Sequence, residues 1–295
     1  MAVSGIAGVP IDCSGRFTGV ERMPAALRAA GLAARLNLPD WGDLPAAIDN
    51  ADRDLQTGII GYEAVCTASQ VIQDGIAALI RQKRRPLIIG GCCTLLIGTF
   101  AALRAEIGHT GLTFVDGHLD FYDGRSSPTG EAADMELAIL SGIGPVTLTE
   151  LGGTPPPLVM PEHVVLLGYR DSEKAERDGA PHPATHAPGM ILYDAQAVQQ
   201  HDPATLGQQT AARLEAAPGR FWLHLDLDVL DDTVLPAVDY LMPGGLDWET
   251  FIQLNRPLAH SPALVGADVT IYNPALDPDG RYARRIVDAL AAILS

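Results

Sequence analysis

The sequence is poor in basic, cysteine and aromatic residues, and these shortages exclude several classes of protein. Lys and Arg total 20 against 36 Asp and Glu, a formal net charge of −16, which argues against a nucleic-acid or anionic-membrane partner. Four cysteines in 295 residues do not make a disulfide framework. No apolar run approaches the roughly 18 residues of a membrane-spanning helix, and no export signal is visible. We therefore expect a cytoplasmic protein.

Apolar residues make up 47% of the chain and aromatics only 5%, so Ala, Leu, Val and Ile dominate, as in a parallel sheet wrapped by helices. Short β-branched runs alternate with helix-like stretches, which predicts one α/β domain over residues 1–295. Strands are expected at 3–9, 86–90, 111–116, 163–168, 189–193, 221–229 and 263–272. Helices are expected at 24–36, 62–84, 95–107, 133–141, 203–216, 248–259 and 280–294. The stretches 152–161 and 171–188 are expected to be loops.

Two clusters of acids and histidines follow expected strands. One holds Asp116, His118 and Asp120, and the other holds His224, Asp226 and Asp228. Alternate side chains of an extended chain share a face, and ligands of open α/β sheets bind beyond the carboxyl ends of the strands. Buried carboxylates repel one another, and neither cluster contains a Lys or Arg, so a divalent metal is the economical counter-charge. The alternative is that these are helix-capping and surface aspartates.

A third strand end carries Gly90-Gly91-Cys92-Cys93-Thr94. The paired glycines permit a tight turn into the next helix, which would place Cys93 near the helix N-terminus. The helix dipole favours a thiolate there, although small buried cysteines are also ordinary packing residues. The sequence alone leaves both interpretations of Cys93 open.

Together these motifs resemble the ureohydrolase family, which includes arginase and agmatinase. The resemblance extends from Gly8-Val9-Pro10, through the three segments above, to Asn273-Pro274. It implies a three-layer αβα fold with a mostly parallel sheet of about eight strands. It also implies a binuclear manganese site and a homo-oligomer, a trimer or hexamer.

The resemblance implies a role for each motif residue. Asp116 and Asp226 would bridge two metal ions, and His118 and Asp228 would complete one site. Asp120 would serve the other site and act as the catalytic residue that orients the attacking water. Cys93 stands where the family has a histidine ligand, which would favour zinc or occupancy by a single metal.

The part of the chain that would bind substrate departs further from the family. Ala133 stands where the family has a proton-transfer histidine, and Ile271 where it has the glutamate that pairs with the guanidinium. Glu131, Glu173 and Tyr240 are the candidate substrate-binding residues. Recognition of arginine is therefore not expected.

These residues predict a metal-dependent hydrolase of a C–N bond in a small, linear guanidino or amidino compound. A modified guanidine, such as an N-hydroxyguanidine, would need less proton transfer to the leaving group. Two alternatives remain at this point. One is a mononuclear hydrolase that resembles the deacetylases of this fold, and the other is a non-catalytic homologue with an impaired metal site.

Overall fold

A computed structural model describes residues 3–153 and 155–295, and these form one parallel sheet of eight strands. The strands are β1 (Gly5–Val9), β2 (Asp40–Asp43), β3 (Pro86–Gly90), β4 (Gly111–Val115), β5 (Val164–Tyr169), β6 (Ile191–Asp194), β7 (Phe221–Asp226) and β8 (Leu264–Thr270). Their order across the sheet is β2-β1-β3-β8-β7-β4-β5-β6, and every neighbouring pair is parallel. The predicted fold class is confirmed.

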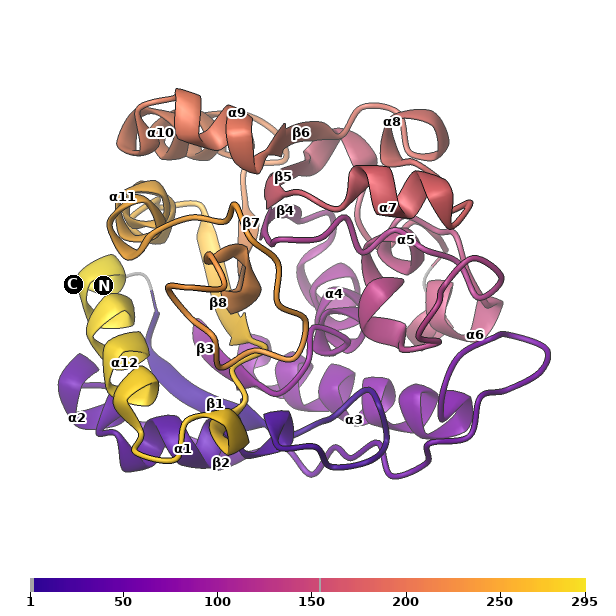
Figure 1. The fold of residues 1–295 in the computed structure, drawn as a ribbon, viewed down its shortest axis with the longest axis horizontal. Helices are drawn as coiled ribbons and strands as arrows, with labels where there is room; N and C mark the ends of the chain where they lie inside the picture. Colours follow the sequence, from indigo (N-terminus) through magenta and orange to yellow (C-terminus); the bar gives the residue numbers. More distant parts are fainter. Residues whose placement is uncertain (1–2, 154) are drawn as a thin grey trace.

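Helices cover both faces of the sheet, so the molecule has three layers (Figure 1). The helices are α1 (Met23–Ala29), α2 (Leu32–Leu36), α3 (Tyr62–Arg81), α4 (Leu95–Ile107), α5 (Glu136–Leu140), α6 (Val146–Thr149), α7 (Ser172–Arg177), α8 (Pro183–His186), α9 (Ala195–Gln200), α10 (Pro203–Ala216), α11 (Trp248–Ala259) and α12 (Arg281–Leu294). In Figure 1 the layer of α10, α11 and α12 lies left of the sheet, and α4 and α5 lie to its right. Within residues 3–153 and 155–295, no helix has both the length and the apolar character needed to cross a membrane.

Burial of the central strands on both faces explains their continuous apolar sequences. Every residue of β3, β4 and β7 is buried, as expected for a parallel sheet between two helical layers. The helix α4 is buried from Leu95 to Leu103, which agrees with its almost wholly apolar sequence. By contrast, α12 has its buried residues on one face and its exposed residues on the other, as a surface helix does.

The structure differs from the expected elements at several places, including the short helices α6 and α9, which were not expected, and three of the differences have a clear local reason. The edge strand β2 was not expected, because its sequence Asp-Trp-Gly-Asp is polar and largely exposed. The expected helix 24–36 divides into α1 and α2 at Gly31, which has a φ of 90° that a helix interior does not allow. The expected loop 171–188 contains the short helices α7 and α8, whose apolar periodicity is too brief to detect.

Four adjacent strands at the centre of the sheet end on the residues that the sequence singled out. In sheet order these are β3, β8, β7 and β4, and their carboxyl ends lead to Cys93, Ile271, Asp226 and Asp116. On either side of this region the connections between strands run in opposite directions across the sheet. Open α/β sheets bind ligands at such a switch point, beyond the carboxyl ends of the strands. The topology therefore gathers segments far apart in sequence at one edge.

A close contact in this central region gives the first prediction. A Cβ at Gly266 in β8 would lie 2.3 Å from Cζ3 of Trp222, a fully buried side chain of β7. Because this ring cannot move within a packed core, we expect G266A to lower the free energy of unfolding by about 1–3 kcal/mol in urea titrations. V265A, at the neighbouring half-buried position, is the control and should cost no more than about 1 kcal/mol. Equal urea midpoints for G266A and the natural chain would contradict this packing.

Candidate metal centre

The structure brings together the six predicted metal ligands at the carboxyl ends of β3, β4 and β7. Ligand atoms of Asp116, His118 and Asp228 lie within 4.8 Å of one another. A second set, with the same spacing, joins Cys93, Asp116, His224 and Asp226, and a third joins Cys93, Asp116, Asp120 and Glu136. Asp116 belongs to all three sets, which suits the bridging position that the sequence assigned to it.

Backbone amides fix the orientation of the central carboxylates. The amide of His118 donates to Asp116 Oδ1 at 2.7 Å, and the amide of Asp228 donates to Asp226 Oδ1 at 2.8 Å. The amide of Gly117 donates to Asp228 Oδ1 at 3.1 Å. The second oxygen of Asp228 lies 3.0 Å from Nδ1 of His118. One side of each carboxylate is thus held by the chain, while the other side faces the cluster.

Cys93 lies inside the cluster. Its Sγ donates to Asp226 Oδ2 at 2.6 Å, and the residue is 2% exposed. Burial, followed by the negative charge of Asp226, raises the pKa of the Cys93 thiol well above its usual value. Only a nearby cation would give a thiolate at neutral pH. The placement excludes the packing interpretation in which Cys93 contacts only apolar neighbours.

Two residues that the motifs did not assign as ligands also belong to the cluster. The sequence placed His224 in the second cluster, as a residue that could support the metal ligands from the same face as Asp226, and its Nε2 lies 3.7 Å from Asp116 Oδ2. Glu136 was not singled out, and its side chain is fully buried. In the sequence, Glu136 is a lone acid within the apolar run from Met135 to Leu140. A search for motifs at strand ends does not find such a residue.

The electrostatics of the cluster show a shortage of positive charge. Burial, and then the charges of neighbouring carboxylates, raise the pKa values of Asp120, Asp226 and Glu136 well above their usual range. For Asp116 burial acts in the same direction, but contacts with His118 and His224 outweigh it and lower the pKa. The charged form of these carboxylates is unfavourable in the buried cluster, and a bound cation would stabilise it.

Unpartnered polar atoms test whether a metal fits. Asp116 Oδ2, His224 Nε2 and both carboxylate oxygens of Glu136 are buried and find no hydrogen-bond partner in the described part of the chain. Buried polar atoms rarely lack partners, so these atoms mark a place for a ligand. Carboxylate, imidazole and thiol donors together suit borderline divalent ions, and the thiol favours zinc over manganese.

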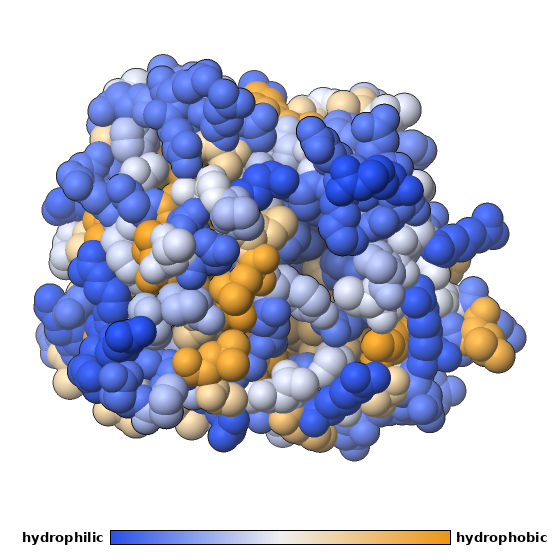
Figure 2. Space-filling model, in the orientation of Figure 1, coloured by the Kyte–Doolittle hydropathy of each residue, from blue (hydrophilic) through white to orange (hydrophobic). Residues whose placement is uncertain are grey.

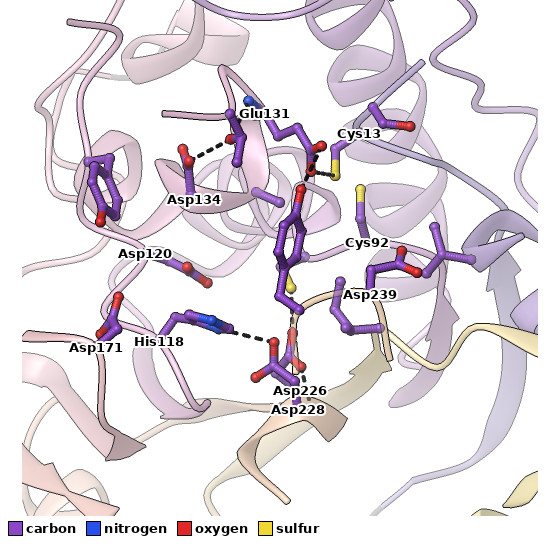
Figure 3. A pocket seen from close by; sticks show the side chains of 18 of the residues that line it. Cys13, Cys92, His118, Asp120, Glu131, Asp134, Asp171, Asp226, Asp228 and Asp239 are labelled. Carbon is purple, nitrogen blue, oxygen red and sulfur yellow. Dashed lines mark hydrogen bonds and ion pairs between the residues drawn. The ribbon is translucent and has the colours of Figure 1, made fainter. Parts of the chain in front are cut away.

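A cavity of about 790 Å³ opens above the cluster. Figure 3 shows His118, Asp120, Asp226 and Asp228 in one part of it and Glu131 with Cys13 at the opposite end. Among the described residues that line it, eight are acidic and the one lysine or arginine is Lys174. Beyond the cluster the acids are Asp12, Glu131, Asp134, Asp171 and Asp239. A strongly anionic pocket concentrates cations and so favours a positively charged substrate.

The predicted substrate residues divide into two groups. Glu131 and Tyr240 line the cavity, where the Tyr240 hydroxyl donates to Glu131 Oε1 at 2.8 Å and Cys13 Sγ donates to Oε2 at 3.3 Å. Glu173 does not line the cavity; its side chain is 94% exposed on α7 and lies 3.8 Å from Arg177. Its placement does not support the predicted substrate contact. The nearby carboxylate that does line the cavity is Asp171, two residues earlier.

The two departures from the family pattern also face the cavity. Ala133 and Ile271 both line it, so a methyl group and an apolar side chain occupy places where the sequence comparison expected a histidine and a glutamate. Ile271 has a φ of 70°, a strained value for a β-branched residue, and its amide donates to Gly91 O at 2.8 Å. The strain indicates that the loops around the cavity, and not local preference, fix this position.

The surface around the site is mostly hydrophilic. Figure 2, in the orientation of Figure 1, shows hydrophilic residues over most of this face and small hydrophobic groups near its centre. Tyr240 and Leu241, which line the cavity, are 44% and 50% exposed. The cavity thus has an anionic interior with a partly apolar rim.

Comparisons with known proteins agree with this geometry. A model of the arginase family matches residues 3–295. The arginase of Bacillus caldovelox is 29% identical in sequence, over 98% of this chain and 96% of its own length. Its native structure at pH 5.6 superposes with a TM-score of 0.86 at 27% identity, and the match covers 100% of this chain and 99% of that one. Arginase from Bacillus subtilis superposes with a TM-score of 0.85 at 25% identity, covering 99% and 98%. Formimidoylglutamase from Bacillus subtilis, at 18% identity and a TM-score of 0.73 over 100% and 86%, shares the fold.

Metal binding should stabilise the folded chain, because the cluster exists only in that state. After treatment with a chelator, we expect added zinc, cobalt or manganese to raise the melting temperature, with about 2.7 kcal/mol gained at a 100-fold excess over the dissociation constant. D226N should lose most of this gain. D288N, a control on the exposed side of α12, should keep it. An equal response in both variants, measured by scanning calorimetry, would contradict binding at the cluster.

Asp134 at the cavity wall gives a prediction of pH dependence. Burial raises its pKa to about 6, although Ser127 and Thr129 donate to its Oδ2 at 2.7 and 2.6 Å. A carboxyl with a raised folded-state pKa contributes stability that is complete below its unfolded pKa of about 3.9 and is lost as the pH rises through 6. Relative to D134N, the natural chain should therefore lose about 2–3 kcal/mol of unfolding free energy between pH 4 and pH 8. Parallel urea-unfolding profiles would refute the assignment.

Proposed function

We propose that this chain, which belongs to the arginase family of C–N hydrolases, hydrolyses a C–N bond of a linear guanidino or amidino cation other than arginine. The observation that carries the proposal is the group of unpartnered buried carboxylates around Asp116 at the floor of an anionic cavity. A divalent cation would stabilise such a group of buried carboxylates. The negative charge of the cavity would attract a cationic substrate.

The residues divide between two metal positions, inner and outer. At the inner position Cys93 and Asp120 would act together with Asp116 and Asp226. At the outer position His118 and Asp228 would share the same two aspartates. Bound divalent ions would supply a water that is activated at neutral pH. Oxygen and imidazole donors at the outer position suit manganese, whereas the thiol at the inner position favours zinc or lower occupancy.

Asp120 is the residue that we propose to handle the proton. It is buried and lines the cavity, and its φ of 45° turns the side chain out of the extended direction of the chain. Its ligand oxygen lies within 4.8 Å of the ligand atoms of Cys93, Asp116 and Glu136, so it is placed beside the metal cluster to take a proton from the attacking water and to hold it until the amine leaves. A strained backbone at a proton-transfer residue fits the pattern of functional sites.

Glu131 is the residue that we propose to bind a positively charged part of the substrate that lies away from the bond to be cut. It lies at the far end of the cavity from the metal cluster, and burial raises its pKa. Tyr240 and Cys13 fix its two oxygens, so the carboxylate is oriented before substrate arrives. The apolar Ile271 and Ala133 leave the leaving group without a charged or proton-donating partner at those places. A modified guanidine such as an N-hydroxyguanidine, which needs less proton transfer, therefore suits the cavity better than arginine does.

We also propose that the chain forms a homo-oligomer, a trimer or hexamer. Leu55 and Val146 are 99% and 66% exposed, so both apolar side chains are available for contacts between copies. Light scattering of the purified protein distinguishes a single chain from an assembly, and a monomer would end this proposal.

The activity is tested with chelator-treated protein reloaded with manganese, zinc, cobalt or nickel. Each form is given guanidino compounds with and without an N-hydroxy group and with and without an α-amino acid head, and urea and ammonia are measured. We expect turnover of non-arginine guanidines and a loss of about 10²–10⁴-fold in kcat for D120N, whose side chain cannot hold the proton. No release from any pair of metal and substrate would refute the proposal.

The role of Glu131 is tested by comparing two glutamate variants. E131Q removes the charge that would bind the cation, so KM should rise about 10- to 100-fold, the equivalent of one charge-assisted hydrogen bond. E173Q removes a charge that is exposed and outside the cavity, so KM should not change. A rise in KM for E173Q but not for E131Q would reverse the assignment.

A further inference from the structure

An imidazole lies close to the inner metal position, but it comes from a different place in the sequence than the histidine of the family motif. His224 projects from β7, and its Nε2 belongs to the set of ligand atoms from Cys93, Asp116 and Asp226 that lie within 4.8 Å of one another. All four residues are buried. Cys93 comes from the turn between β3 and α4, so the thiol and the imidazole reach the same point from neighbouring regions of the sheet.

His224 is held in the orientation that a metal ligand needs. Its Nδ1 lies 2.6 Å from Asp268 Oδ2, and Trp222 Nε1 donates to the other oxygen of Asp268. In the tautomer that donates the Nδ1 proton to Asp268, which is the form that can bind a metal, the lone pair of Nε2 faces the cluster. Nε2 is fully buried and has no hydrogen-bond partner in residues 3–153 and 155–295. A carboxylate behind a histidine whose second nitrogen is free is the usual arrangement of metal-binding histidines.

We propose that His224 supplies the imidazole ligand of the inner metal position, in place of the histidine that the family has at position 93. The ligands of the inner position are then Cys93, Asp116, His224 and Asp226, a set of one sulfur, one nitrogen and two carboxylates that suits zinc or cobalt, and Asp120 stays beside them as the proton-transfer residue. The inference rests on the metal-dependent function proposed above, because Asp116 and Asp226 serve both positions.

Glu136 is the competing ligand, and two observations favour His224. Asp268 holds His224 through a hydrogen bond at 2.6 Å, whereas neither oxygen of Glu136 has such a partner within the described chain. The set with Glu136 also includes Asp120 and carries four acidic groups, against three for the set with His224. Fewer uncompensated charges around one divalent ion cost less in a buried site.

Cobalt is the probe for the experiment, because a cobalt–thiolate bond has a charge-transfer absorption that does not depend on turnover. Chelator-treated protein is titrated with Co²⁺, and we expect the thiolate band to saturate with the first ion bound. C93S should abolish the band. H224N should weaken binding of that ion by at least about 10-fold, and D268N, which only frees the imidazole, should weaken it by about 10- to 100-fold.

H118N is the matched histidine control. It removes the imidazole of the outer position, so the cobalt stoichiometry should fall while the thiolate band keeps its intensity and midpoint. X-ray absorption of H118N loaded with one equivalent of zinc gives a second readout that needs no change at His224. We expect one sulfur at about 2.3 Å and one imidazole at about 2.0–2.1 Å, the imidazole being that of His224.

Each outcome decides the proposal. An unchanged cobalt midpoint in H224N, or loss of the band in E136Q but not in H224N, would overturn it in favour of Glu136. Absence of imidazole scattering in zinc-loaded H118N would overturn it as well, and would leave His224 as a charged partner of Asp116. If the natural chain hydrolyses guanidines without any thiolate band, the inner site is refuted and the proposed function stands. If the bands behave as expected but no guanidine is hydrolysed, the site stands and the proposed function fails.

Discussion

The mutual repulsion of carboxylates at the centre of the sheet is the constraint on which this site depends. Asp116, Asp120, Asp226 and Glu136 are buried close together, while the described lining of the cavity offers Lys174 as its one lysine or arginine. Protons can neutralise some of these groups, which is why several of their pKa values are raised. Divalent cations would offset much of this negative charge while the groups stay ionised, and the unpartnered atoms face the place where such cations would lie.

Sheet topology makes this repulsion possible, because it forces acids from distant segments to one edge. β4 and β7 are neighbours, so the residues that follow them, Asp116 and Asp226, cannot separate without breaking the ladder between the strands. The strands are buried on both faces and pack between two helical layers, so the stability of the core holds the site in place. A loop-based site could relax by moving its acids apart, whereas this one cannot.

The sequence predicted the sheet better than it predicted the site. Continuous apolar runs marked β3, β4 and β7, whereas the polar edge strand β2 gave no such signal. For the site, alternate acids at strand ends revealed Asp116 and Asp226, since period-two spacing is a local property of extended chain. Glu136 could not be found this way, because it enters from a helix whose approach to the cluster is set by tertiary packing. For Glu173 the family resemblance predicted a substrate contact, and its exposed position on α7, outside the lining of the cavity, does not support that prediction.

Replacing a histidine ligand by Cys93 has consequences beyond one bond. As a ligand, a thiolate would bring a negative charge that a neutral imidazole does not, so a site that also holds Asp116 and Asp226 would be more anionic and would favour a thiophilic ion over manganese. Retaining one imidazole from another strand limits that change, because the ion then has a neutral donor among its ligands. The Trp222–Asp268–His224 chain of hydrogen bonds is difficult to explain as packing alone, since it buries three polar groups in order to aim one nitrogen at the cluster. The substituted motif and the relocated imidazole are therefore best understood as one change in the kind of metal that the fold holds.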